Sequence, residues 1–231
     1  MKIVGIVGGI APESTVEYYR LIIDSYREQV RDGSYPQIII NSIDLNRMRS
    51  LIEANKLVEL TDYMVNEVQR LERAGADFGL LASNTPHLVF DEIAGRSRIP
   101  LLSIVEAACE AAKSLELKRV GLFGTRFTMQ GQFYPEVFSR AGVQIIIPKL
   151  EEQDYIHNRY MDELVLGRFL DETREGLLEI VDRMKERDGI EGLILGGTEL
   201  PLILRDDAGR GIPFLDTTRI HVKAIVSYLL S

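Results

Sequence analysis

Two short segments of the chain carry small polar residues directly after an apolar run. Residues 79–87, Gly-Leu-Leu-Ala-Ser-Asn-Thr-Pro-His, change from apolar to polar at Ser83. Residues 192–200, Gly-Leu-Ile-Leu-Gly-Gly-Thr-Glu-Leu, make the same change around Gly197. A buried parallel strand that delivers polar groups to a ligand ends in this way. We expect the two segments to face each other across one active-site cleft.

Four junctions between a predicted strand and the turn after it supply groups that could bind a ligand there. They are residues 8–9, 83–85, 124–128 and 197–198. Glycines let the backbone approach a ligand closely, helix N-termini supply N–H donors, and hydroxyl and amide groups add directional hydrogen bonds. One such junction alone is an ordinary turn, but four at related positions favour a site for a small carboxylate or a phosphate.

Other chemistries fit these residues less well. The spacing of residues 5–9 matches neither a dinucleotide fingerprint nor a P-loop. The three histidines show no metal-ligand spacing with Cys109, so no metal site is predicted. Ser83 and His87 are spaced like an activated serine, but no supporting acid is recognisable, and His87 fits better as a residue that caps or packs at a helix start. Cys109 lies in an alanine-rich helical segment and is predicted to be a packed thiol.

Regular elements that would position these residues alternate along the chain, which indicates parallel sheets. Hydrophobic periodicity predicts strands at 2–7, 37–43, 77–81, 99–104, 119–123, 144–147, 192–195 and 212–216. It predicts helices from about residue 13 to 26 and at 57–74, 105–115, 133–141, 152–164, 168–187, 198–204 and 217–230. Residues 44–50 are polar, and we expect them to form a loop over the cleft.

The two halves of the chain repeat one another. Three pairs of segments correspond at nearly constant spacing: 4–9 with 120–125, 81–85 with 195–199, and 99–102 with 212–215. The sequence therefore predicts an α/β fold of two pseudo-symmetric lobes, each a parallel sheet flanked by helices, with the cleft between them. The expected N-terminal lobe comprises residues 1–98 and 214–231, and the expected C-terminal lobe comprises residues 99–213.

Composition excludes several classes of function. The chain has 231 residues, of which 45% are hydrophobic and 27% charged, as in soluble globular proteins. Its net charge of −8 argues against binding to nucleic acid or to an anionic membrane. A single cysteine permits no internal disulfide and fits a cytoplasmic protein. No apolar run is long enough to span a membrane, and no signal-peptide pattern follows the start.

Six segments spread along the whole chain form one further pattern. They are residues 8–15, 18–21, 83–87, 124–129, 197–200 and 215–217. With them the chain resembles the aspartate/glutamate racemase family, closest to bacterial racemases that accept both amino acids. The resemblance implies two pseudo-symmetric lobes, a homodimer, no pyridoxal phosphate or other cofactor, and a small acidic amino acid such as aspartate or glutamate as substrate.

The same resemblance implies roles for individual residues. The family uses one cysteine from each lobe to move the α-proton, and this chain has Ser83 and Gly197 at those two positions. Asn84, Thr85 and Thr198 match positions that hold the substrate's amino and carboxylate groups. Thr125 and Thr128 match the binding loop of the second lobe more loosely, and Gly9 completes the predicted binding set. Some aspartate racemases hold the distal carboxylate with a lysine where this chain has Val165; Arg47 or Arg49 could replace it, unless both are surface charges.

The missing thiols leave three functions open. A serine hydroxyl is too weak an acid to replace a thiolate, and losing a general base typically costs about 10²–10⁴ in rate. Glu199 and His87 are candidate replacements, although Glu199 fits better as a carboxylate favoured by a helix N-terminus. The chain could be a racemase or isomerase acting at an α-carbon, a lyase or decarboxylase that stabilises an enolate in the same pocket, or a non-catalytic binder of a small carboxylate.

Overall fold

The computed structural model describes residues 2–204 and 210–231. These residues form two compact units, the first comprising residues up to Ile104 with His221–Ser231, the second Val105–Ile220. Each unit holds one four-stranded sheet within the described ranges, with orders β2-β1-β3-β4 and β6-β5-β7-β8, and every pairing is parallel. The second order is the first one repeated, which confirms the predicted α/β class and its two lobes.

The unit limits lie later along the chain than the lobe limits expected above. The reason is strand pairing: β4 hydrogen-bonds to β3 in the first sheet, and β8 hydrogen-bonds to β7 in the second. In the described ranges, no helix is long and apolar enough to cross a lipid bilayer.

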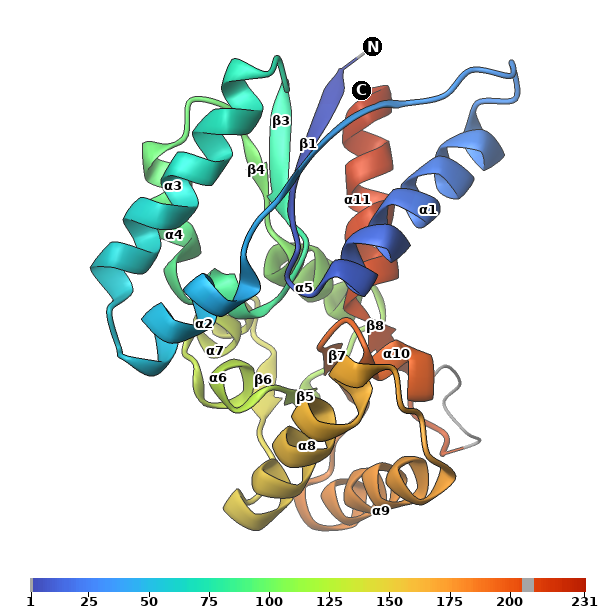
Figure 1. The fold of residues 1–231 in the computed structure, drawn as a ribbon. Coiled ribbons are helices and arrows are strands. Elements are labelled where there is room, and N and C mark those ends of the chain that lie inside the picture. Colours follow the sequence, from blue (N-terminus) through green and yellow to red (C-terminus); the bar gives the residue numbers. More distant parts are fainter. Residues whose placement is uncertain (1, 205–209) are drawn as a thin grey trace. The chain divides into compact units, whose positions relative to one another are not determined.

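The first unit takes most of its elements from the N-terminal half of the chain (Figure 1). Its strands are β1 (Ile3–Gly8), β2 (Gln37–Ser42), β3 (Phe78–Leu81) and β4 (Leu101–Leu102). Its helices are α1 (Pro12–Gln29), α2 (Leu45–Glu53), α3 (Leu57–Arg73), the 3₁₀ helix η1 (Thr85–Val89), α4 (Phe90–Arg96) and most of α11 (Thr217–Leu230).

Alternation of side chains gives the first sheet two different faces. Val4 and Ile6 point to the face covered by α1 and α11, where they pack with Tyr18 and Ile225. Gly5 points to the other face, toward α3, where an added Cβ would lie 2.9 Å from the Cβ of Ala76 and 3.0 Å from Leu71. Figure 1 shows the two pairs of helices, α1 with α11 and α3 with α4, on opposite sides of the strands.

The second unit is built in the same way from the elements that follow. Its strands are β5 (Arg119–Gly124), β6 (Gln144–Ile146), β7 (Gly192–Gly196) and β8 (Phe214–Asp216). Its helices are nearly all of α5 (Ile104–Ser114), α6 (Arg126–Gln130), α7 (Phe133–Arg140), α8 (Leu150–Asp162), the 3₁₀ helix η2 (Leu164–Leu166), α9 (Asp171–Asp188) and α10 (Leu200–Ile203).

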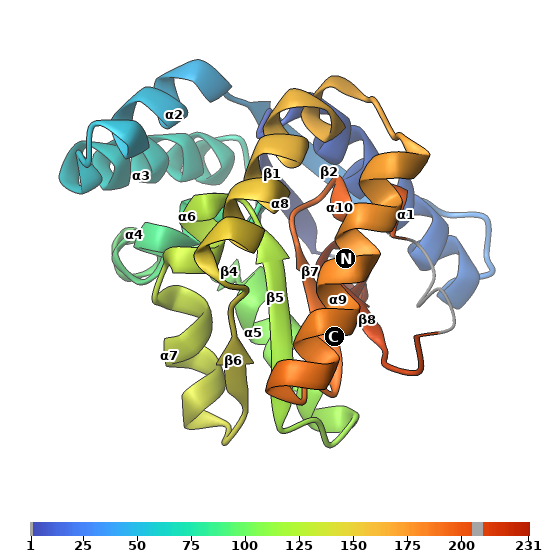
Figure 2. The same cartoon turned by 90° about the horizontal axis from the view of Figure 1, so that it is seen from below.

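Helices α8 and α9 lie over one face of the second sheet (Figure 2). Leu193 and Leu195 of β7 point into this layer and pack with Ile156 and Tyr160 of α8 and with Leu177 of α9. Burying an aliphatic or aromatic side chain of this size contributes about 1.5–3 kcal/mol relative to leaving it exposed. This apolar layer fixes the distance of α8 from the strand ends.

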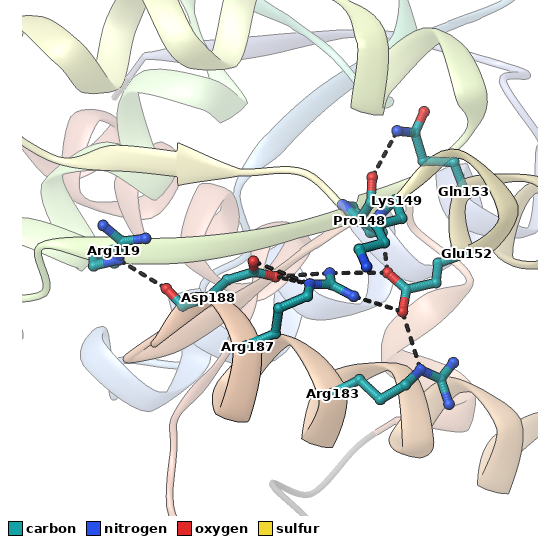
Figure 3. Close-up of polar contacts among 8 residues, drawn as sticks. All are labelled: Arg119, Pro148, Lys149, Glu152, Gln153, Arg183, Arg187 and Asp188. Atoms are coloured by element: carbon teal, nitrogen blue, oxygen red, sulfur yellow. Dashed lines mark hydrogen bonds and ion pairs between the residues drawn. The ribbon is translucent and has the colours of Figure 1, made fainter.

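Charged residues hold α8 against α9 (Figure 3). The Glu152 carboxylate accepts hydrogen bonds from Arg183 Nε at 3.0 Å, from both Arg187 terminal nitrogens at 3.1 Å and from the Lys149 backbone N–H at 2.9 Å. Burial raises the pKa of the Glu152 carboxyl, but the hydrogen bonds from Arg187, Lys149 and Arg183 outweigh it and lower that pKa to about 2. Just after α8, Glu163 accepts hydrogen bonds from Arg159 and Thr173. Helix α8 is therefore anchored near both of its ends.

One expected element is wrong. Residues 44–50 were expected to form a loop, but α2 begins at Leu45, because Asp44 caps it by accepting a hydrogen bond from the Asn46 N–H at 2.9 Å. Met48 and Ile52 are the buried residues of this helix, so its apolar signal is short and easily missed among polar neighbours.

Candidate functional site

The ends of β1 and β3 meet at one edge of the first sheet. Their parallel register pairs Val7 with Leu81, so Gly9 and Ser83 both follow the last paired residues. Gly9 has φ +84°, and its N–H donates to Thr15 Oγ1 at 2.8 Å. A Cβ on Gly9 would lie 2.5 Å from the Ile43 carbonyl oxygen. The turn after β1 therefore has no room for any other residue.

Polar residues after β3 begin a 3₁₀ helix. Ser83 is 9% exposed and Asn84 2% exposed, whereas Thr85, the first residue of η1, is partly exposed. Pro86 stands in the first turn, where its missing N–H costs nothing. Gly9, Ser83, Asn84 and Thr85 thus gather at one sheet edge, and we call them the first strand-end cluster.

His87 holds this turn in place. Its Nδ1 lies 3.1 Å from the Ser83 carbonyl oxygen, which can only accept, so Nδ1 carries the proton. Its Nε2 accepts from the Ile104 backbone N–H at 3.3 Å. Burial, assisted by the charge of His221, lowers the pKa of His87 to about 3. The ring is neutral and bonds the backbone of Ser83, not its hydroxyl, which supports packing and argues against an activated serine.

A second buried histidine ties three further elements of the first unit together. His221 Nε2 lies 3.1 Å from the Leu102 carbonyl oxygen and therefore donates to it. Its Nδ1 accepts from the Tyr18 hydroxyl at 2.9 Å. Burial lowers the pKa of His221 to about 4, although the bond to Leu102 opposes this shift. Helices α1 and α11 and strand β4 are linked in this way behind the first strand-end cluster.

The two histidines should make the protein sensitive to mild acid. Their folded pKa values of about 3 and about 4 lie below the ordinary 6.5, so only the unfolded chain takes up protons as the pH falls. Their stabilisation is complete above about pH 6.5 and is lost below it. Between about pH 6.5 and about pH 5, the free energy of unfolding should fall by about 1.4 kcal/mol per pH unit for each histidine.

Urea unfolding at both pH values measures this loss. A His87→Gln/His221→Gln variant is the control, because glutamine does not titrate and carboxyl groups titrate mainly nearer pH ~4. Its dependence on pH should be much weaker than that of the wild type. Equal unfolding free energies of the wild type at the two pH values would show that the histidines are not held neutral.

The second sheet presents a matching edge. Its register pairs Gly124 of β5 with Gly196 of β7. Thr125 caps α6: its Oγ1 accepts from the Thr128 N–H at 3.3 Å and lies 3.2 Å from the Thr128 hydroxyl. Thr128 is fully buried, whereas Thr125 is partly exposed.

Residues after β7 meet a tyrosine that the sequence analysis did not identify. The hydroxyl of Tyr160, from α8, donates to Glu199 Oε2, and the Thr198 hydroxyl donates to the same oxygen at 2.9 Å. A Cβ on Gly197 would lie 2.5 Å from Tyr160 Cε2 and 2.8 Å from the Tyr160 hydroxyl oxygen. Tyr160 therefore fills the space that a side chain at position 197 would need.

Burial and the nearby Glu199 carboxylate hold the pKa of Tyr160 well above its ordinary value. The phenol consequently keeps its proton at neutral pH. We call Thr125, Thr128, Gly197, Thr198 and Glu199 the second strand-end cluster. That its members face those of the first cluster stays a prediction.

Arg47, Arg49 and Cys109 contact residues outside the two clusters. The Arg47 guanidinium lies over the Tyr63 ring at 4.3 Å, and Arg49 pairs with Glu53 on α2 at 3.3 Å. Cys109 is buried in α5, where burial raises the pKa of its thiol. Tyr160 is the residue that the sequence does not single out, because an aromatic residue on an amphipathic helix is expected in the core.

The sequence and the fold both match known proteins. The profile of a family described as Asp/Glu/Hydantoin racemase matches residues 7–225. A Yersinia pestis structure, described as that of a candidate Asp/Glu racemase, is 30% identical with a TM-score of 0.92 over 100% of both chains. An aspartate racemase homologue from Pyrococcus horikoshii is 32% identical with a TM-score of 0.86 over 100% of both chains. RacX of Bacillus subtilis, named a broad specificity amino-acid racemase, is 25% identical over 99% of this chain and 98% of its own length.

Proposed function

We propose that this chain, which belongs to the Asp/Glu/hydantoin racemase family, binds a small acidic amino acid and exchanges its α-proton without pyridoxal phosphate. The observation that carries the proposal is the pair of strand-end clusters at equivalent positions of two sheets with the same strand order. Ligands of open α/β sheets bind at the carboxyl ends of the strands. The amino acids we favour are aspartate and glutamate.

Each cluster offers groups suited to an amino acid. In the first, the Asn84 amide and the partly exposed Thr85 lie beside Ser83. In the second, Thr125 and Thr198 are partly exposed hydroxyl residues. Such donors hold carboxylate oxygens, and hydroxyl or amide oxygens accept from an ammonium group. We include in the proposal a cytoplasmic location and a homodimer. Light scattering of the purified protein would test the homodimer.

Proton transfer in this chain cannot use a thiol at either strand end. Ser83 and Gly197 occupy the two positions. The single cysteine of the sequence, Cys109, is buried in α5, a helix that follows neither β3 nor β7. Because loss of a general base costs about 10²–10⁴ in rate, we expect slower exchange than in a cysteine-bearing relative.

A second candidate is a binding protein without catalysis. It is favoured by the Tyr160 ring, which occupies the space beside Gly197 and leaves no room there for an acid or base attached to the strand end. This candidate shares the ligand and the two clusters, and it differs only in the absence of proton transfer.

Exchange of the α-proton in deuterated water separates the two candidates. The protein is incubated with L- or D-aspartate and L- or D-glutamate, and loss of the α-proton signal is followed by NMR. Binding is measured separately as thermal stabilisation, which reaches about 2.7 kcal/mol when ligand exceeds its Kd by about 100-fold. We expect both exchange and stabilisation. Stabilisation without exchange would establish the binding protein, and absence of both for all four amino acids would refute the proposed function.

A further inference from the structure

The Tyr160–Glu199 pair is a proton-bearing group that the proposed function does not yet use. Its two members come from different elements: Tyr160 from α8 and Glu199 from the turn that caps α10. They are 6% and 4% exposed, and the tyrosine hydroxyl donates to Glu199 Oε2. A buried hydrogen bond to a carboxylate in this setting is stronger than one between neutral groups.

The pair also lies at the carboxyl end of β7, where a reactive side chain on the strand end would be placed. Glu199 follows Gly197 by two residues at the carboxyl end of β7, and the Tyr160 hydroxyl oxygen would be 2.8 Å from a Cβ at position 197. A side-chain acid or base attached to position 197 would begin at this Cβ. The hydroxyl of Tyr160 therefore occupies the region that a functional side chain at the strand end would reach.

We propose that Tyr160 and Glu199 act together as a proton relay at the end of β7, with the hydroxyl as the group that exchanges a proton with the substrate α-carbon. The inference rests on the proposed function, since it assigns the acid and base of that site. Thr198, whose hydroxyl donates to the same Glu199 oxygen at 2.9 Å, is a positioning residue for the carboxylate.

The relay conserves charge and protons in one step. The bond between the α-carbon and its proton breaks, and this proton forms a new bond to the Tyr160 oxygen. At the same time the original hydroxyl proton moves along its hydrogen bond to Glu199 Oε2. The electron pair of the broken bond stays on the substrate as a carbanion, and Glu199 becomes a neutral acid. The reverse movement returns a proton to the carbanion.

This order of events agrees with the surroundings of the phenol. A free phenolate beside the Glu199 carboxylate is disfavoured, because burial and that negative charge keep the pKa of Tyr160 well above its ordinary value. In the relay Tyr160 gains one proton as it gives up another, so no phenolate forms. The Glu199 carboxylate is the final acceptor of a proton, and the Tyr160 hydroxyl lies between this carboxylate and the substrate α-carbon.

The test compares three variants with the wild type in the α-proton exchange assay. Tyr160→Phe keeps the ring beside Gly197 and removes the hydroxyl, while Glu199→Gln keeps the shape of the acceptor and removes its basicity. Because one deletion can leave a buried polar partner unsatisfied, Tyr160→Phe/Glu199→Gln removes both groups together. Tyr155→Phe, five residues earlier on α8 and outside both clusters, is the matched control.

We expect each of the three variants to lose at least about 10²-fold in exchange rate, the usual contribution of a general acid or base, while Tyr155→Phe changes it by less than about 2-fold. Thermal stabilisation by aspartate or glutamate should persist, which shows a folded and occupied site.

The outcomes separate the relay from the proposed function. If all three variants exchange the α-proton at the wild-type rate, the relay is wrong and the proposed function stands. Ligand stabilisation without wild-type exchange would overturn both, in favour of the binding protein. Loss of ligand stabilisation in the double variant alongside loss of exchange would identify the pair as a binding element and contradict the relay.

Discussion

Gly197→Cys should destabilise the protein by about 2–6 kcal/mol, far more than a glycine-to-cysteine change usually costs. The new Cβ would lie 2.5 Å from Tyr160 Cε2, closer than such atoms can approach. Tyr160 would have to move, and its hydrogen bond to Glu199 would break. Overpacking of a filled core costs about 1–3 kcal/mol, and loss of the buried hydrogen bond to the Glu199 carboxylate costs about another 1–3 kcal/mol.

Urea unfolding of the wild type and four variants isolates this clash. Gly95→Cys is the control for replacing a glycine with a cysteine where no clash arises. Gly95 lies in α4, and an added Cβ there meets no atom within 4 Å. In a double-mutant cycle, Tyr160→Ala/Gly197→Cys should lose less than the sum of its single substitutions, since the first makes room for the second. Additive losses, or a Gly197→Cys protein as stable as Gly95→Cys, would show that Tyr160 does not fill this space.

The same clash limits any attempt to restore thiol chemistry. Ser83→Cys with Gly197→Cys supplies both thiols, but the second side chain competes with Tyr160 for one volume. Racemase activity should therefore rise further when Tyr160→Ala is added to the pair. A chiral assay of aspartate or glutamate measures this gain.

Gly9→Ala should also be strongly destabilising, by about 2–5 kcal/mol. Gly9 has φ +84°, where an L side chain costs about 1–2 kcal/mol. Its new Cβ would also lie 2.5 Å from the Ile43 carbonyl oxygen and 2.8 Å from the Ile43 nitrogen. These atoms belong to the backbone just after β2, which cannot rotate away as a side chain can. The clash should therefore add about 1–3 kcal/mol.

Gly33→Ala provides a closely matched control for backbone strain. Gly33 has φ +83°, and an added Cβ there meets no atom within 4 Å, so only the cost of the conformation remains. The difference between the two unfolding free energies measures the clash alone. We also expect Gly9→Ala to weaken ligand stabilisation and Gly33→Ala to leave it unchanged. Equal destabilisation by both substitutions would mean that the turn after β1 has spare room.

The fold was predictable from the sequence because its signals are local and occur twice. Apolar runs that stop at Gly9, Ser83 and Gly197 mark strand ends, and their repetition predicts two equivalent sheets. Helix α2 was not predicted, since its start depends on a single capping contact from Asp44 and only two of its residues are buried.

The candidate site was predictable only in part. Residues that directly follow strands are placed by the strands themselves, which is why both strand-end clusters could be named from the sequence. Tyr160 could not be named in this way, because it lies on an amphipathic helix where an aromatic residue is expected in the core. Its link to Gly197 and Glu199 depends on how α8 packs over β7, and packing of that kind leaves no mark in a single sequence.

The contact between Tyr160 and Gly197 makes these two positions interdependent. With a side chain at position 197, the tyrosine ring cannot lie where it does, because the new Cβ would lie 2.5 Å from Tyr160 Cε2. A substitution at position 197 alone is therefore expected to be destabilising. A stable protein with a side chain at 197 should require a second substitution, to a smaller residue at 160, so we expect these two positions to change together.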